Sequence, residues 1–132
     1  MDARDKAKIE TAVEAVLPQV WLGITGIDLV SKLAEEMNLP VGQNGVLVQK
    51  VFDEGPAKTS GIIGSDKPYL LDGQPILIGG DVITAIDGSK VTSFDQLREL
   101  IGQHDPGDNV NILLIRDGKE KTIQVELESL PG

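Results

Sequence analysis

The chain has 132 residues, no cysteine and a formal net charge of −9 at pH 7. Hydrophobic residues make up 40% of it and aromatic residues only 3%, so any core consists mainly of Val, Ile and Leu. These values predict one small domain, exclude disulfides, Cys-ligated zinc and thiol nucleophiles, and argue against nucleic acid or an anionic membrane as a general partner.

The first segment with a clear pattern is a helix over Ala3–Leu17. Apolar residues recur there at helical spacing, and Pro18 ends the pattern. Its thin apolar stripe is typical of a linker, so we expect residues 1–17 to form a helical linker segment. The charged start lacks the apolar segment of a signal peptide, and no apolar run in the chain approaches the roughly 18 residues that a membrane span needs.

An unusual strand follows in "VWLGITGIDLV", residues 20–30. It is apolar enough to be buried, but Gly23 and Gly26 interrupt it. Glycine inside a strand marks a bulge or a close approach to the backbone. The approaching group is either the chain itself or a ligand.

Further elements are expected in chain order. "SKLAEEMNLP" predicts a short helix with Ser31 as N-cap, "GVLVQKVF" a strand, and the stretch around Pro56 one helical turn. The clearest helix is "SFDQLRELIGQH", with Ser93 as N-cap, and "NVNILLIRDGKEKTIQVELE" predicts two long strands.

Three Asp-Gly pairs mark turns, because both residues tolerate positive φ. Asp72-Gly73 and Asp117-Gly118 predict tight hairpins, and Asp87-Gly88 a looser turn. The expected fold is α+β: five to six short strands in a partly open sandwich or barrel, with two helices, the N-terminal helix and an extra hairpin over residues 64–78.

No catalytic constellation is evident. His104 is the sole histidine, lies beside "DPGD", and is expected to be a solvated loop residue; no serine stands in a nucleophile motif. Most acidic residues occur at expected turns or exposed helix faces, and no spacing matches a calcium or zinc site. We therefore expect no catalytic residue, no metal and no cofactor.

The order of four segments, "WLGI", "GVLVQKVFDEGPAKTSGI", "GGDVITAIDGSKVTSFDQLRELI" and "PGDNVNILLIRDGKEKTIQVEL", resembles the PDZ domain of HtrA/Deg (trypsin-like) serine proteases. The resemblance covers Pro18 to Leu127 and implies a non-catalytic PDZ domain over residues 18–130. In that family the domain is attached to a protease domain, and a periplasmic or extracytoplasmic location is implied. The 64–78 hairpin departs from the family's usual pattern, and no basic residue directly precedes "WLGI".

The resemblance implies capture of hydrophobic C-terminal or exposed extended peptides by strand addition. The family's carboxylate-binding loop falls on Leu22, Gly23 and Ile24. The implied groove comprises Trp21, Thr25, Gly26, Ile27, Phe94, Leu97, Arg98 and Ile101. Gly23 would free backbone N–H groups for the carboxylate, and Gly26 would enlarge the pocket for the last peptide side chain.

Two alternatives remain open from the residues. Leu97, Leu100 and Ile101 fit a simple core face as well as a groove wall. The domain also fits a structural role, in which it controls protease assembly and binds no peptide of its own. If peptides do bind, the acidic net charge favours those that are basic or neutral upstream of their carboxylate.

Overall fold

The computed structural model describes residues 20–40 and 42–130, so the predicted helix of residues 1–17 lies outside the described residues. The helices are α2 (Ser31–Glu36), α3 (Pro56–Ser60) and α4 (Phe94–Gly102). The strands are β1 (Val20–Trp21), β2 (Ile24–Asp28), β3 (Val46–Val51), β4 (Lys67–Leu71), β5 (Gln74–Ile78), β6 (Val82–Ile86), β7 (Ser89–Lys90), β8 (Asn109–Arg116), β9 (Lys119–Glu126) and β10 (Glu128–Ser129).

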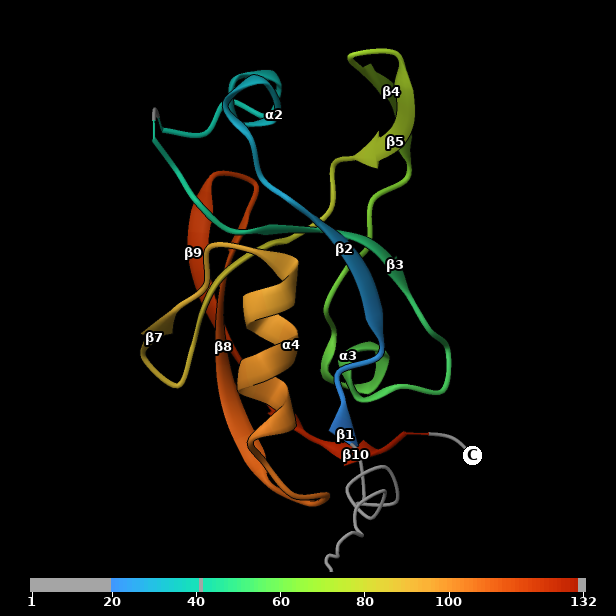
Figure 1. Ribbon diagram of the computed structural model, residues 1–132, viewed down its shortest axis with the longest axis vertical. Coiled ribbons are helices and arrows are strands. Elements are labelled where there is room, and N and C mark those ends of the chain that lie inside the picture. The colour runs from blue at the N-terminus through green and yellow to red at the C-terminus, as the bar shows by residue number, and fades with distance from the viewer. Residues whose placement is uncertain (1–19, 41, 131–132) are drawn as a thin grey trace, which may run out of the picture.

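An open antiparallel sheet forms the centre of the fold. Its strand order is β2-β3-β6-β8-β9, with β7 added to β6, while β1–β10 and β4–β5 form separate two-stranded pairs. Within the described residues β2 and β9 are therefore the two ends of this strand order, and the two-residue β7 is a further, short edge. The mixture of antiparallel strands, short helices and an extra β4–β5 hairpin confirms the α+β prediction (Figure 1).

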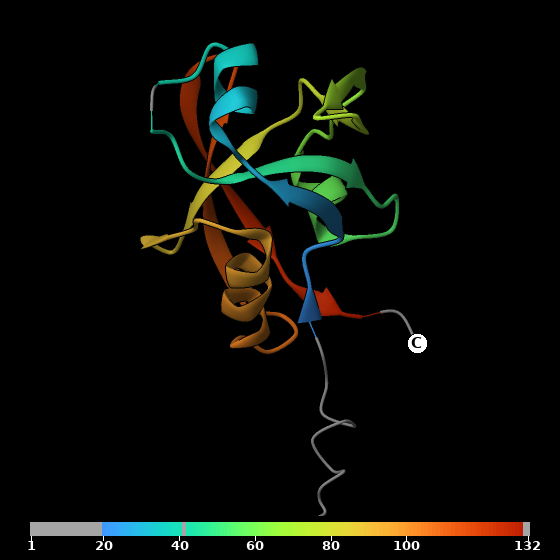
Figure 2. The same cartoon turned by 45° about the horizontal axis from the view of Figure 1, so that its top comes forward.

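The core consists of two clusters. The first lies under α4 and includes Leu22, Val46, Leu97 and Ile101; the second lies under α2 and the β4–β5 hairpin and includes Leu33. In both ribbon views α2 and the hairpin stand at the end of the molecule away from the β1–β10 pair (Figures 1 and 2). Aliphatic side chains thus form two separate core clusters.

The sequence signals for helix starts hold for α4 and α3 but not for α2. The Ser93 side chain accepts a hydrogen bond from the Gln96 N–H at 3.1 Å and begins α4, as predicted, and Pro56 stands in the first turn of α3. The predicted Ser31 cap is wrong. Val30 is the N-cap of α2, and no side chain caps it.

All three Asp-Gly turns have positive φ at both residues. The turns at Asp72 and Asp117 close tight hairpins, which confirms the prediction. The Asp87 turn is also tight, because Ile86 pairs directly with Ser89, so the expected looser turn is wrong. The strand after this turn, β7, has only two residues, so the turn is less prominent in the sequence.

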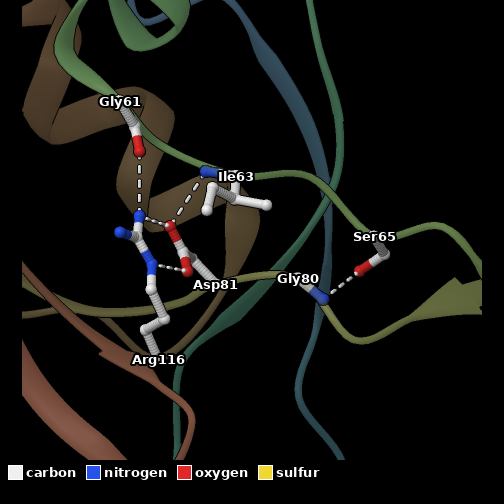
Figure 3. A network of polar contacts seen from close by, with 6 residues as sticks. All are labelled: Gly61, Ile63, Ser65, Gly80, Asp81 and Arg116. Carbon is white, nitrogen blue, oxygen red and sulfur yellow. Dashed lines mark hydrogen bonds and ion pairs between the residues drawn. The ribbon is translucent and has the colours of Figure 1, made fainter.

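One carboxylate does not follow the expected pattern of exposed acids. Asp81 is 1% exposed and accepts hydrogen bonds from Arg116 at 2.8 and 2.7 Å and from the Ile63 N–H at 2.9 Å (Figure 3). Arg116 also donates to the Gly61 carbonyl. These bonds to Asp81 raise the pKa of Arg116. The network joins α3, the start of β6 and the end of β8.

Candidate functional site

The candidate site is the outer edge of β2 beside α4 (Figure 1). Among the described residues β2 pairs with β3 alone, so its other edge is open. The Asp28 carboxylate accepts a hydrogen bond from the Phe94 N–H at 2.8 Å and ties the far end of β2 to the start of α4. An open strand edge next to a helix can receive an extended peptide.

The register shows which groups of β2 point outward. The Phe52 N–H donates to the Gly23 carbonyl, and the Leu29 N–H donates to the Gly45 carbonyl, both at 2.9 Å. In antiparallel pairing these bonds alternate along the strand. The N–H and C=O groups of Ile24, Gly26 and Asp28 therefore point away from β3, toward the open edge.

The loop before β2 has its carbonyls directed inward. The Leu22 carbonyl accepts from the Ala57 N–H and the Gly23 carbonyl from the Phe52 N–H, both at 2.9 Å. The C=O and N–H of one trans peptide unit point in opposite directions, and the described residues contain no cis peptide bond. The N–H groups of Gly23 and Ile24 thus point away from α3 and β3. Two adjacent donors of this kind suit an anion.

Gly23 is required by the chain itself. Its φ is +88°, and a Cβ there would lie 2.9 Å from the Gly55 Cα. Gly55 likewise has no room for a Cβ, because it would lie 2.9 Å from the Gly23 Cα. The two backbones touch. In the sequence, the position of Gly55 directly before a helix-starting proline is a signal for a constrained backbone. The sequence does not show that Gly55 contacts Gly23.

The sequence suggested that Gly26 enlarges a pocket, but the space beside it is occupied by core side chains. A Cβ there would lie 2.5 Å from Val46 Cγ1 and 3.3 Å from Phe94 Cδ1. Core side chains therefore fill the space that the missing side chain leaves. The candidate contribution of Gly26 is its outward backbone.

The α4 residues divide into core and rim. Leu97 is 1% and Ile101 4% exposed, and both belong to the first core cluster, so the structure shows them as core and not as an open groove wall. Phe94 is half-buried at Gly26. Arg98 is exposed, pairs with Asp95, and lies 5.3 Å from the Phe94 ring centroid.

The remaining predicted groove residues lie on different sides of β2. Ile24 packs against the first cluster and Ile27 against the second, so the Ile27 side chain faces away from α4. Thr25 is exposed and pairs with Lys50. Trp21 is half-buried, with its ring centroid 5.6 Å from that of Phe52.

His104 lies in the loop after α4, as predicted, but it is partly buried and not fully solvated. Its Nδ1 lies 3.0 Å from the Leu100 carbonyl and its Nε2 3.5 Å from Asp87, and its side chain is 25% exposed. These contacts fasten the end of α4 to the β6–β7 turn. Over residues 20–40 and 42–130 no three His, Cys, Asp or Glu side chains gather as a metal site.

Comparison with known proteins identifies the family. Residues 22–127 match the family model described as "PDZ domain". The chain belongs to the PDZ domain family. A PDZ domain is a non-catalytic module, and no helix in the described part of the chain is long and apolar enough to cross a membrane.

Curated relatives of this PDZ domain are serine endoproteases. It is 30% identical over 132 residues to a probable periplasmic serine endoprotease DegP-like of Pseudomonas fulva, covering 100% of this chain and 23% of the relative. It is 33% identical over 107 residues to periplasmic serine endoprotease DegP of Escherichia coli, covering 81% and 19%. The chain thus spans about a fifth of the length of these relatives.

Solved structures share the fold. The HtrA-type protease AlgW with decapeptide is 24% identical with a TM-score of 0.69, covering 95% of this chain and 34% of that chain. The HtrA3 PDZ domain bound to the phage-derived ligand FGRWV is 18% identical with a TM-score of 0.63, covering 86% and 89%.

Proposed function

We propose that this PDZ domain captures the C-terminus of an extended peptide as an added strand on β2. The observation that carries the proposal is the pair of outward N–H groups at Gly23 and Ile24, at the start of an open strand edge. An antiparallel peptide would place its carboxylate at Leu22–Ile24 and its upstream residues beside Gly26 and Asp28. Each charge-assisted hydrogen bond contributes about 1.5–3 kcal/mol before desolvation.

The other sheet edge suits this role less well. β9 carries Lys119, Glu120 and Lys121, all exposed, and it contacts α3. Charged side chains on an edge strand discourage strand addition. The β2 edge instead carries the uncharged residues Ile24 and Gly26, so it is the better edge for strand addition.

The last peptide side chain would enter between Ile24 and α4. Leu97 and Ile101 would form the floor of this pocket, with Phe94 and Arg98 at its rim. Because Leu97 and Ile101 are 1% and 4% exposed, a ligand reaches them only when α4 moves outward from β2. The cost of this opening lowers the affinity for small side chains that gain little apolar contact.

The relatives supply the biological setting. They are periplasmic serine endoproteases of which this chain spans about a fifth. We propose that residues 18–130 form the PDZ domain of an HtrA-like protease outside the cytoplasm, that residues 1–17 link it to the protease domain, and that captured peptides belong to substrates or regulators of that protease.

Isothermal titration calorimetry tests the proposal. The probes are FGRWV and its variants ending in Leu, Phe or Ala, each with a C-terminally amidated twin. We expect at least one free-carboxylate peptide to bind about tenfold or more tightly than its twin, equivalent to about 1.4 kcal/mol. If no peptide in the panel binds in a carboxylate-dependent way, the proposal is wrong.

A second candidate function is structural: assembly of copies of the chain into an oligomer, or contact with a neighbouring domain of the parent protein. The outer face of the β4–β5 hairpin favours it, because Pro68, Leu70 and Pro75 are exposed there and Leu70 is 67% exposed. Sedimentation velocity over a concentration series separates the two functions: a stable oligomer that does not respond to the peptide panel supports the structural role.

A further inference from the structure

The pairing of β2 with β3 shifts register between Thr25 and Gly26. Thr25 pairs with Lys50, but the next residue, Gly26, pairs with Val48. Gln49 is thus the extra residue of a β-bulge on β3. A bulge bends its strand and increases the local twist. This one lies opposite the step between the carboxylate loop and the upstream half of the β2 edge.

Gln49 is bound to the inserted hairpin. Its side-chain amide donates to the Leu77 carbonyl at 2.6 Å and accepts from the Leu77 N–H at 3.0 Å. The amide therefore satisfies both main-chain groups of one β5 residue, as a neighbouring strand would. Both bonds are partly buried, so solvent competes with them less than at an exposed site.

The base of the hairpin also rests on the bulge. The Ser65 N–H donates to the carbonyls of Val48 and Gln49 at 3.1 Å each, and the Ser65 hydroxyl donates to the Val48 carbonyl at 2.7 Å. A Cβ on Gly64 would lie 3.1 Å from the Gln49 carbonyl. β3 pairs with β6 only through Val46 and Leu47, so beyond that point the inserted segment occupies this side of β3.

We propose that Gln49 is a positioning residue through which the inserted hairpin sets the peptide specificity of the groove. The bulge that it holds fixes the direction of the Gly26–Asp28 half of β2 relative to the carboxylate loop. The hairpin thereby determines how residues upstream of the peptide's last two are received. The carboxylate loop is held separately, by Ala57 and Phe52. This inference rests on the proposed function.

If Gln49 positions only the upstream half of the groove, its substitution should affect a pentapeptide but not a dipeptide. The probes are the tightest pentapeptide of the panel above and its acetylated last two residues. Gln49→Leu keeps the approximate size of the side chain and removes both hydrogen bonds. We expect it to weaken the pentapeptide about tenfold, and to leave the affinity of the dipeptide unchanged, both measured by NMR titration.

Two further variants make the test specific. Gln124→Leu makes the same change at an exposed position of β9 and should alter neither affinity. Gln49→Glu keeps an acceptor for the Leu77 N–H but sets a carboxylate oxygen against the Leu77 carbonyl, so it should weaken the pentapeptide at least as much as Gln49→Leu. It also provides the length comparison if Gln49→Leu does not fold.

An equal loss for both ligands, or no loss for either, overturns the inference, because only a positioning role divides the effect by peptide length. Failure of the proposed function has a different signature. In that case the unaltered protein shows no carboxylate-dependent binding to any pentapeptide.

Discussion

Gly23→Ala, compared with Gly61→Ala, isolates the energy of the backbone contact that shapes the candidate carboxylate loop. Both glycines have a positive φ, +88° and +96°. A Cβ at Gly61 meets nothing within 4 Å, whereas one at Gly23 would lie 2.9 Å from the Gly55 Cα. The backbone strain is therefore common to both variants, and the steric contact belongs to one of them.

The magnitudes follow from these two terms. A left-handed conformation costs an L-residue about 1–2 kcal/mol, and alanine recovers about 0.4–1 kcal/mol by restricting the unfolded chain. We therefore expect Gly61→Ala to lower the free energy of unfolding by about 1 kcal/mol. Gly23→Ala adds an overpacking cost of about 1–3 kcal/mol, for a total of about 2–4 kcal/mol.

Urea unfolding followed by Trp21 fluorescence measures both variants. Trp21 is the only tryptophan, and its Cζ2 lies 3.5 Å from the position that a Cβ on Gly55 would take. Gly23→Ala should also weaken carboxylate-dependent peptide binding, while Gly61→Ala should not. If Gly23→Ala costs no more than Gly61→Ala, the Gly23–Gly55 contact does not constrain this loop and the reasoning is wrong.

Three other predictions concern stability and the pocket. Asp81→Ala should cost about 1–3 kcal/mol of unfolding free energy, because it leaves the Ile63 N–H and the partly exposed Arg116 without their acceptor. The double variant Asp81→Leu, Arg116→Leu should cost less than the sum of Asp81→Leu and Arg116→Leu measured separately; additive costs contradict the account. Gly26→Val should lower the unfolding free energy by about 1–3 kcal/mol, because its side chain would meet Val46. Unchanged stability with an altered preference for the last peptide residue would instead support the hypothesis that Gly26 enlarges the pocket for that residue. The contact with Asp72 raises the pKa of Lys32. The free energy of unfolding should therefore exceed that of Lys32→Met at neutral pH, and this difference should disappear as the pH rises through the raised pKa. A difference that persists in strong alkali refutes an ionic contribution.

Local chemistry explains which features of the fold could be predicted. Ser93, Pro56 and the Asp-Gly turns each act through their own backbone and near neighbours, so their effect is visible in a few residues of sequence. Ser31 failed as a cap because Val30 already occupies the extended N-cap position and helix α2 begins one residue early.

Long-range contacts account for what the sequence did not show. Asp81 and Arg116 are far apart in the chain, and no sequence pattern near either residue predicts that they form an ion pair. The sequence marked Gly23 as a point of close approach but did not identify Gly55 as its partner, and it did not show that Gln49 binds Leu77. The sequence pattern places Leu97 and Ile101 on one helix face. Whether that face belongs to the core or to a groove wall depends on how deeply the two side chains are buried, which only the structure shows.

The most direct test of carboxylate capture is an amide NMR titration of the uniformly ¹⁵N-labelled protein with the tightest pentapeptide of the panel and its amidated twin. If the outward N–H groups receive the carboxylate, the resonances of Gly23 and Ile24 shift downfield with the free acid, as a charge-assisted hydrogen bond requires, and far less with the amide. Equal shifts with both ligands, or shifts confined to residues outside the Leu22–Ile24 loop, β2 and α4, contradict the account.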